Sequence, residues 1–89
     1  MRRIYKYRLE ITDYQRIELP VGARLLHVGE QSGELYLWAM VWTTNNTEPC
    51  QVRIFGTGNP VYSGDLGEFV GTVQMSSGLV WHVFAEPAP

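Results

Sequence analysis

The feature that most constrains this chain is the segment Leu35 to Trp42 (LYLWAMVW), in which eight consecutive residues are apolar. The run is far shorter than the roughly 20 residues of a membrane span, and it is rich in aromatic side chains, which favour strands. The tight-turn signal Ser32-Gly33 precedes it, so we expect a β-hairpin with residues 24–31. Because both faces of such a strand are apolar, it should lie centrally in a sheet, between two packed sheets or at a subunit contact.

The rest of the chain also favours strands. Val, Ile, Thr, Phe, Trp and Tyr make up 30 of the 89 residues, and such side chains suit a pleated surface better than a helix. Residues 3–11 alternate cations with Tyr5, Tyr7 and Leu9, which predicts a strand with one wet face. Further extended segments are expected at 17–19, 51–56, 69–75 and 79–85, the last two forming a second hairpin around Ser76-Ser77-Gly78.

These segments predict an all-β fold: a small sandwich or a partly open barrel of six to seven short antiparallel strands. Little helix is expected, with room for one helical turn at residues 63–68. Since 89 residues are too few for two domains, residues 1–89 should form a single β domain, with 86–89 as a frayed tail.

Charge and cysteine content narrow the partners and the compartment. Six of the seven cations lie in residues 1–24, and the net charge of −2 opposes binding to a nucleic acid polymer. No segment is long and apolar enough to span a membrane, and the first residues carry charges where a signal peptide is apolar. Cys50 is the single cysteine, which excludes an intrachain disulfide. We therefore expect a cytoplasmic protein without membrane contact.

No pattern in the chain is typical of catalysis or of a metal site. No serine stands in a G-x-S-x-G motif, and neither His27 nor His82 belongs to a His-x-Thr or His-x-Ser motif of a 2H phosphoesterase. The two histidines lie in expected strands, where they are either hydrogen-bonded structural residues or, if they meet in space, a general base or a two-His metal site. Without further ligand spacing, we expect no enzyme activity, no metal and no cofactor.

The loop Gly56-Thr57-Gly58-Asn59-Pro60 is the candidate ligand loop. Its two glycines permit positive φ values that aim backbone N–H groups at an anion, and Thr57 adds a hydroxyl. Arg53 lies on the strand that leads into the loop, where alternation places it with Phe55 on one face and Val52 with Ile54 on the other. The alternative is a purely structural turn, because the chain lacks the Gly-Lys-Ser/Thr of a phosphate-binding loop.

Several short motifs follow one another along the chain, each occurring once. They are Tyr5-Lys6-Tyr7, P-x-G-A-x-x-L-H-V at 20–28 with Gln31 and Trp38, G-T-G-x-P at 56–60, G-T-V at 71–73 and W-H-V-F at 81–84. On these motifs, nearly the whole chain resembles a family of short uncharacterised proteins found mainly in bacteriophage genomes. The resemblance implies a phage gene product that acts in the cytoplasm of the bacterial host. By analogy, compact phage proteins of this size bind host proteins or sequester nucleotide-derived immune signals in pockets at subunit interfaces.

Two functions are therefore open. The first is a non-enzymatic anti-defence protein, homo-oligomeric, that sequesters a nucleotide-derived immune signal, with an ADP-ribose-like molecule preferred over a cyclic dinucleotide. Its expected ligand-binding residues are Gln31, Trp38, Arg53, Gly56, Thr57, Gly58 and His82. The alternative is a protein-binding inhibitor of a host or defence enzyme, which would use Tyr5, Tyr7 and the basic N-terminal strand.

Overall fold

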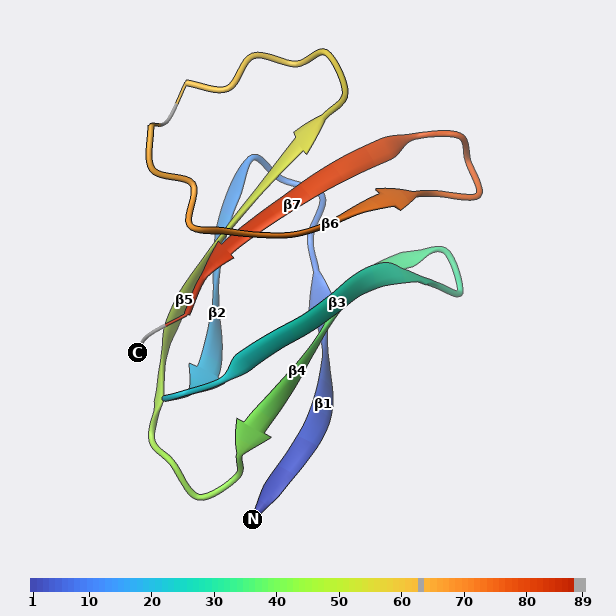
Figure 1. Ribbon diagram of the computed structural model, residues 1–89. Helices are drawn as coiled ribbons and strands as arrows, with labels where there is room; N and C mark the ends of the chain where they lie inside the picture. Colours follow the sequence, from blue (N-terminus) through green and yellow to red (C-terminus); the bar gives the residue numbers. More distant parts are fainter. Residues whose placement is uncertain (63, 88–89) are drawn as a thin grey trace.

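The computed structural model describes residues 1–62 and 64–87, and within them the chain forms seven strands and no helix. The strands are β1 (Arg2–Leu9), β2 (Tyr14–Pro20), β3 (Arg24–Gln31), β4 (Glu34–Trp42), β5 (Thr47–Gly56), β6 (Glu68–Gln74) and β7 (Val80–Glu86). They build two antiparallel sheets, β1-β4-β3 (sheet A) and β2-β5-β7-β6 (sheet B). The predicted all-β fold is confirmed, as a sandwich-like arrangement rather than a closed barrel (Figure 1).

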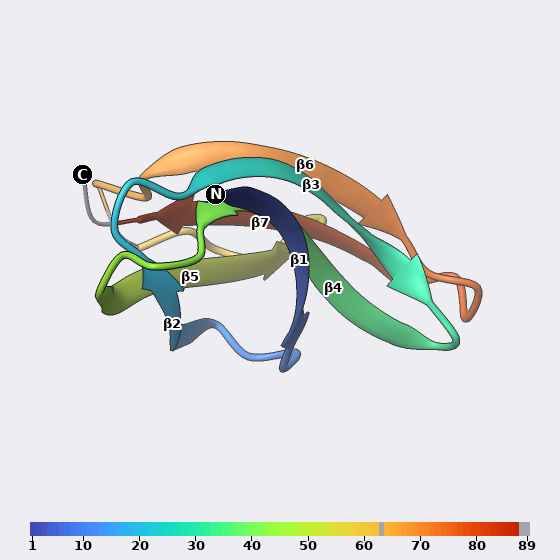
Figure 2. The same cartoon turned by 90° about the horizontal axis from the view of Figure 1, so that it is seen from below.

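The two sheets approach each other along β3 and β6, which run side by side in both views (Figures 1 and 2). Gly71 of β6 permits this approach, because a Cβ atom at its position would lie 3.0 Å from Val28 Cγ2 on β3. Between the sheets lies a core of aliphatic side chains and one buried thiol. Its members are Leu9, Leu19, Ala23, Val28, Leu35, Leu37, Ala39, Val41, Cys50, Val52, Ile54, Val73, Val83 and Ala85.

Strand β4 is central in sheet A, as the apolar run predicted, and it pairs with β1 and β3. Its side chains alternate strictly: Leu35, Leu37, Ala39 and Val41 are buried, whereas the intervening side chains are half-buried or exposed. The expectation that both faces are covered is therefore wrong for the single chain. Its outward row consists of large side chains, three of them aromatic: Tyr36, Trp38, Met40 and Trp42.

Strand β1 has the predicted wet face. Arg2, Lys6 and Arg8 pair across the sheet with the outward residues of β4, whereas Arg3 pairs with the buried Val41 and Leu9 lies in the core. Tyr7 packs against the core and Tyr5 is 43% exposed. Partial burial, and to a lesser degree the neighbouring Tyr5, raises the pKa of Tyr7 above its ordinary value.

Residues 57–62 and 64–67 belong to a long irregular connection between β5 and β6, yellow to orange in Figure 1. Residues 64–67 hold no helical turn, and Ser63, the first residue of that expected turn, lies outside the described residues. Gly67 ends the connection with φ +81°, where a Cβ atom would lie 2.7 Å from the carbonyl oxygen of Ala85 on β7. The connection is thus anchored against sheet B.

Strand β7 ends beside this connection, since a Cβ atom at Gly67 would lie 2.9 Å from Glu86 Cβ. Glu86, expected in a frayed tail, is instead the last residue of β7, while residues 88–89 lie outside the described part. Among the described residues, there is no helix long and apolar enough to cross a membrane.

Candidate functional site

Five of the seven expected ligand-binding residues lie together at sheet B. Arg53 is on β5, Gly56, Thr57 and Gly58 form the turn where β5 ends, and His82 is on the neighbouring strand β7. The other two lie elsewhere: Gln31 ends β3 and Trp38 is on the outward row of β4, both in sheet A. The structure therefore separates the expected residues into one cluster and two distant positions.

The turn at Gly56–Asn59 has the geometry of a structural β-turn. The Asn59 N–H donates to the Gly56 carbonyl oxygen at 3.0 Å, and Gly58 has φ +86°, which strongly favours glycine. This hydrogen bond occupies the Asn59 N–H that an anion-binding loop would present to a ligand. The backbone of this loop is therefore a structural turn, which was the alternative to a ligand loop. The Thr57 side chain contacts His82.

His82 is held between two hydroxyl groups. Its Nε2 lies 2.7 Å from Thr57 Oγ1, and its Nδ1 lies 2.9 Å from Thr72 Oγ1 on β6. The register places Thr72 directly across from His82, so strand pairing brings these side chains together. In a neutral imidazole one nitrogen donates and the other accepts, and a hydroxyl can serve either role, so both ring nitrogens are satisfied.

The two histidines do not meet. His27 lies on β3 in sheet A, with its ring centroid 5.8 Å from that of Trp38, whereas His82 lies in sheet B. Within residues 1–62 and 64–87 no group of three or more His, Cys, Asp or Glu side chains is placed to hold a metal ion.

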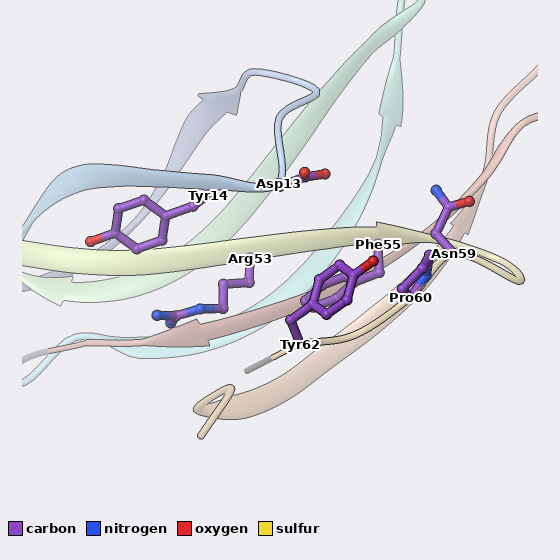
Figure 3. A pocket seen from close by; sticks show the side chains of 7 residues that line it. All are labelled: Asp13, Tyr14, Arg53, Phe55, Asn59, Pro60 and Tyr62. Carbon is purple, nitrogen blue, oxygen red and sulfur yellow. The ribbon is translucent and has the colours of Figure 1, made fainter. Parts of the chain in front are cut away.

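A hollow beside Arg53 is the most polar part of the cluster. It encloses about 330 Å³, and its lining consists of Asp13, Tyr14, Arg53, Phe55, Asn59, Pro60 and Tyr62 (Figure 3). The Arg53 guanidinium carbon lies 5.0 Å from the centroid of the Tyr14 ring, a cation–π distance. Figure 3 shows Arg53 and Tyr14 toward one end of this hollow, with Tyr62, Phe55 and Asn59 toward the other. We call it the Arg53 hollow.

A second hollow of about 280 Å³ adjoins the first and shares Phe55 and Asn59 with it. Its floor is aromatic: the Phe84 ring centroid lies 6.1 Å from that of Phe55 and 5.3 Å from that of Phe69. Val61 and Leu66 of the irregular connection and the Thr57–His82 pair complete the wall. We call it the Phe84 hollow.

Sequence reasoning named Arg53 as a ligand-binding residue but did not name its aromatic neighbours, although it placed Phe55 on the same strand face. The period of two along β5 buries Val52 and Ile54 and so places Phe55 on the same outward face as Arg53, a signal that was present. No such signal exists for Tyr14, because it reaches Arg53 only through the pairing of β2 with β5. Tyr62 comes from the irregular connection, for which the sequence has no periodicity.

The comparisons with known proteins establish a family without an activity. The chain matches over residues 1–89 the family described as a domain of unknown function, DUF7352, and it belongs to that family. No curated protein matched the chain, and no solved structure matched it.

Proposed function

We propose that this protein is a non-enzymatic binding protein that sequesters a nucleotide-derived small molecule at the outer face of sheet B. One observation carries the proposal: a guanidinium group, an amide and the rings of Tyr14, Phe55 and Tyr62 line a single hollow of about 330 Å³. Small-molecule sites typically combine apolar and aromatic walls with a few polar groups, in volumes upward of about 300 Å³.

Each part of a nucleotide has a matching group in this hollow. A base stacks on Tyr62 or Phe55, which contributes about 1–3 kcal/mol per base. Arg53 binds a phosphate through a charge-assisted hydrogen bond worth about 1.5–3 kcal/mol. Asn59 and Asp13 offer an amide and a carboxylate to base edges or ribose hydroxyls.

The arrangement favours an elongated ligand of the ADP-ribose kind over a cyclic dinucleotide. Among the described residues that line the two hollows, Arg53 alone has a permanent positive charge, and Asp13 stands in the same hollow. This charge balance suits a ligand whose phosphates lie at one point, with sugar or base extending into the Phe84 hollow. A cyclic dinucleotide carries phosphates on opposite sides of its ring, and the second would lack a cation.

The resemblance to phage proteins gives the proposal its setting: the ligand is a nucleotide-derived immune signal in the cytoplasm of the bacterial host, and binding removes it without chemistry. His82 is hydrogen-bonded to Thr57 on one side and to Thr72 on the other. This arrangement resembles a nucleophile, a base and a group that orients the base. The third group, however, is a neutral hydroxyl, which cannot stabilise an imidazolium as a carboxylate does. We therefore propose a structural role for the Thr57–His82 hydrogen bond, which stabilises the wall of the Phe84 hollow.

The proposal includes a homo-oligomer. Tyr62, which lines the Arg53 hollow, is 91% exposed, and Phe69, which lines the Phe84 hollow, is 55% exposed. A second copy that covered them would close the site and exclude water from the ligand. Light scattering should give a multiple of 10.1 kDa, and a monomer at high micromolar concentration would remove the subunit contact from the proposal.

Calorimetry of the purified protein with ADP-ribose and with a cyclic dinucleotide tests the binding. We expect ADP-ribose to bind more tightly, to be recovered intact, and to lose tenfold or more in affinity with Arg53→Ala. The matched control is Arg16→Ala, which removes an exposed cation on β2 that lines neither hollow. Affinity that is unchanged in a folded Arg53→Ala variant places the ligand elsewhere, and turnover of either ligand contradicts the non-enzymatic assignment.

A further inference from the structure

The outer face of sheet A carries an apolar row between two sets of cations. The row is Trp38, Met40 and Trp42 on β4. The register places Arg2, Ile4 and Lys6 of β1 beside it on one side, and Arg24 of β3 on the other. We call these seven residues the cation-flanked face; it lies on the opposite sheet from the two hollows.

Its side chains are accessible although neighbours hold them in place. Ile4 is 59% exposed and Trp42 is 45% exposed, the latter with the Arg2 guanidinium carbon 5.3 Å from its ring centroid. The Lys6 ammonium lies 4.5 Å from the ring centroid of Tyr36 and donates to Gln31 Oε1 at 2.6 Å. Cations held in this way lose less conformational freedom when they bind a partner.

The positive charge of this face is not offset by carboxylates. In the described part of the chain, the carboxylate ion pairs of sheet A involve Arg8, which contacts Glu10 at 2.8 Å and Glu34 at 3.0 Å. These two partners raise the pKa of Arg8. Arg2, Lys6 and Arg24 make no such pair there, so they remain available to acidic groups of another molecule.

We propose that the cation-flanked face docks an acidic amphipathic helix of another protein. Three strands spaced about 4.8 Å apart make a surface about 10 Å wide, which matches the diameter of a helix of about 10–12 Å. The row from Trp38 to Trp42 extends about 14 Å, the length of about nine helical residues. An apolar stripe on the helix covers this row, and carboxylates on its two flanks reach Arg2 and Lys6 on one side and Arg24 on the other.

Two other occupants fit less well. A nucleic acid base needs a bare ring to stack on, but Arg2 lies over the Trp42 ring and the Trp38 ring contacts those of His27 and Tyr36. A second copy would bring the same cations face to face in a symmetric contact, where like charges repel. An acidic amphipathic helix pairs its carboxylates with the cations and covers the apolar row with its apolar stripe.

The probe is an 18-residue helical peptide with leucines spaced three and four residues apart and glutamates on both flanks. Heteronuclear NMR of the full chain should show shifts confined to β1, β3 and β4, with affinity that falls as salt rises. Arg24→Glu and Trp42→Ala should each weaken binding tenfold or more. The control Arg16→Glu makes the same change in net charge on sheet B and should alter affinity less than twofold.

Three further arms decide the outcome. A peptide of the same composition with scrambled leucines should bind at least tenfold more weakly. Tighter binding of oligo(dT) than of the peptide would assign the face to nucleic acid and overturn the proposal. Absence of peptide binding, or an equal loss with Arg16→Glu, overturns it as well. ADP-ribose binding should persist in Arg24→Glu, so this proposal and the one for sheet B succeed or fail separately.

Discussion

The outer faces of sheets A and B both present aromatic rings, but they use them differently. On sheet A the rings of Tyr36 and Trp42 lie beside cations, and short connections leave the face open. On sheet B Arg53 likewise lies beside the Tyr14 ring, but the rings of Phe55, Phe69 and Phe84 contact one another, and Val61 and Leu66 of the long connection add a wall beside them. The first face is a broad surface and the second is a pair of hollows.

This difference shows what a connection adds to a sheet face. Strand periodicity decides which side chains point outward on either sheet, and it gives each face aromatic residues and at least one arginine. The long connection borders sheet B, where we propose that a small molecule binds, whereas we propose that the open face of sheet A docks a helix. The following predictions test this contrast, from the largest expected effect to the smallest.

Shortening single side chains on the two sides of β4 should reveal which side is buried in solution. Leu37 is fully buried, so Leu37→Ala should lower the free energy of unfolding by about 2–5 kcal/mol. Met40→Ala on the outward row should cost clearly less, because that side chain already contacts water. Urea denaturation of both variants measures the difference. Equal losses would mean that the outer face of sheet A is covered by another copy and is not an open surface.

The connection at sheet B can be loosened without a change in the rings. Gly67 and Gly33 both have φ +81°, but a Cβ atom meets the Ala85 carbonyl oxygen only at Gly67 and nothing within 4 Å at Gly33. Gly33→Ala should cost about 1 kcal/mol for the left-handed backbone, and Gly67→Ala about 1–3 kcal/mol more for the clash. Thermal unfolding measures both, and ADP-ribose affinity should fall in Gly67→Ala alone. Similar stabilities would refute the anchoring role of Gly67.

Polar contacts should also differ in strength between the faces. Thr72→Val leaves one nitrogen of the half-buried His82 without its partner and should cost about 0.5–1.5 kcal/mol. Lys6→Met breaks the exposed contact with Gln31 and should change stability by less than about 0.5 kcal/mol. Denaturant titrations at constant pH compare the two variants. A larger loss with Lys6→Met would contradict the expectation that the His82 contact on sheet B contributes more to stability than the Lys6 contact on sheet A.

The buried thiol between the sheets adds an effect confined to alkaline pH. Burial raises the pKa of Cys50 to about 11, against about 8.5 in an unfolded chain. Below about pH 7 both states keep the proton, so this group contributes no pH dependence there. Between about pH 8.5 and 11 the unfolded chain loses the proton first, so the free energy of unfolding falls as pH rises. The difference between wild type and Cys50→Ala, measured across this range, isolates the thiol from the tyrosines; a flat difference would contradict the burial.

Particular residues show how far sequence reasoning reached. Alternation in β1 and β5 correctly predicted the wet face of cations and the shared face of Arg53 and Phe55. In the segment Leu35–Trp42 every residue is apolar, so the alternation of a strand does not show which side chains face the core. The sequence therefore placed Trp38 among the ligand-binding residues with Arg53. The structure puts the smaller aliphatic side chains inside, where they fit between the two sheets, and directs Trp38 outward.

The sequence by itself determined the strands, their turns and which side chains share a face, because these depend on neighbouring residues and on the period of the pleat. Only the tertiary structure decided which faces adjoin. Tyr14 meets Arg53 through the pairing of β2 with β5, and Thr57 and Thr72 meet His82 across β5, β7 and β6. Such pairings join residues far apart in the chain, and their order depends on the packing of the whole core rather than on any local pattern.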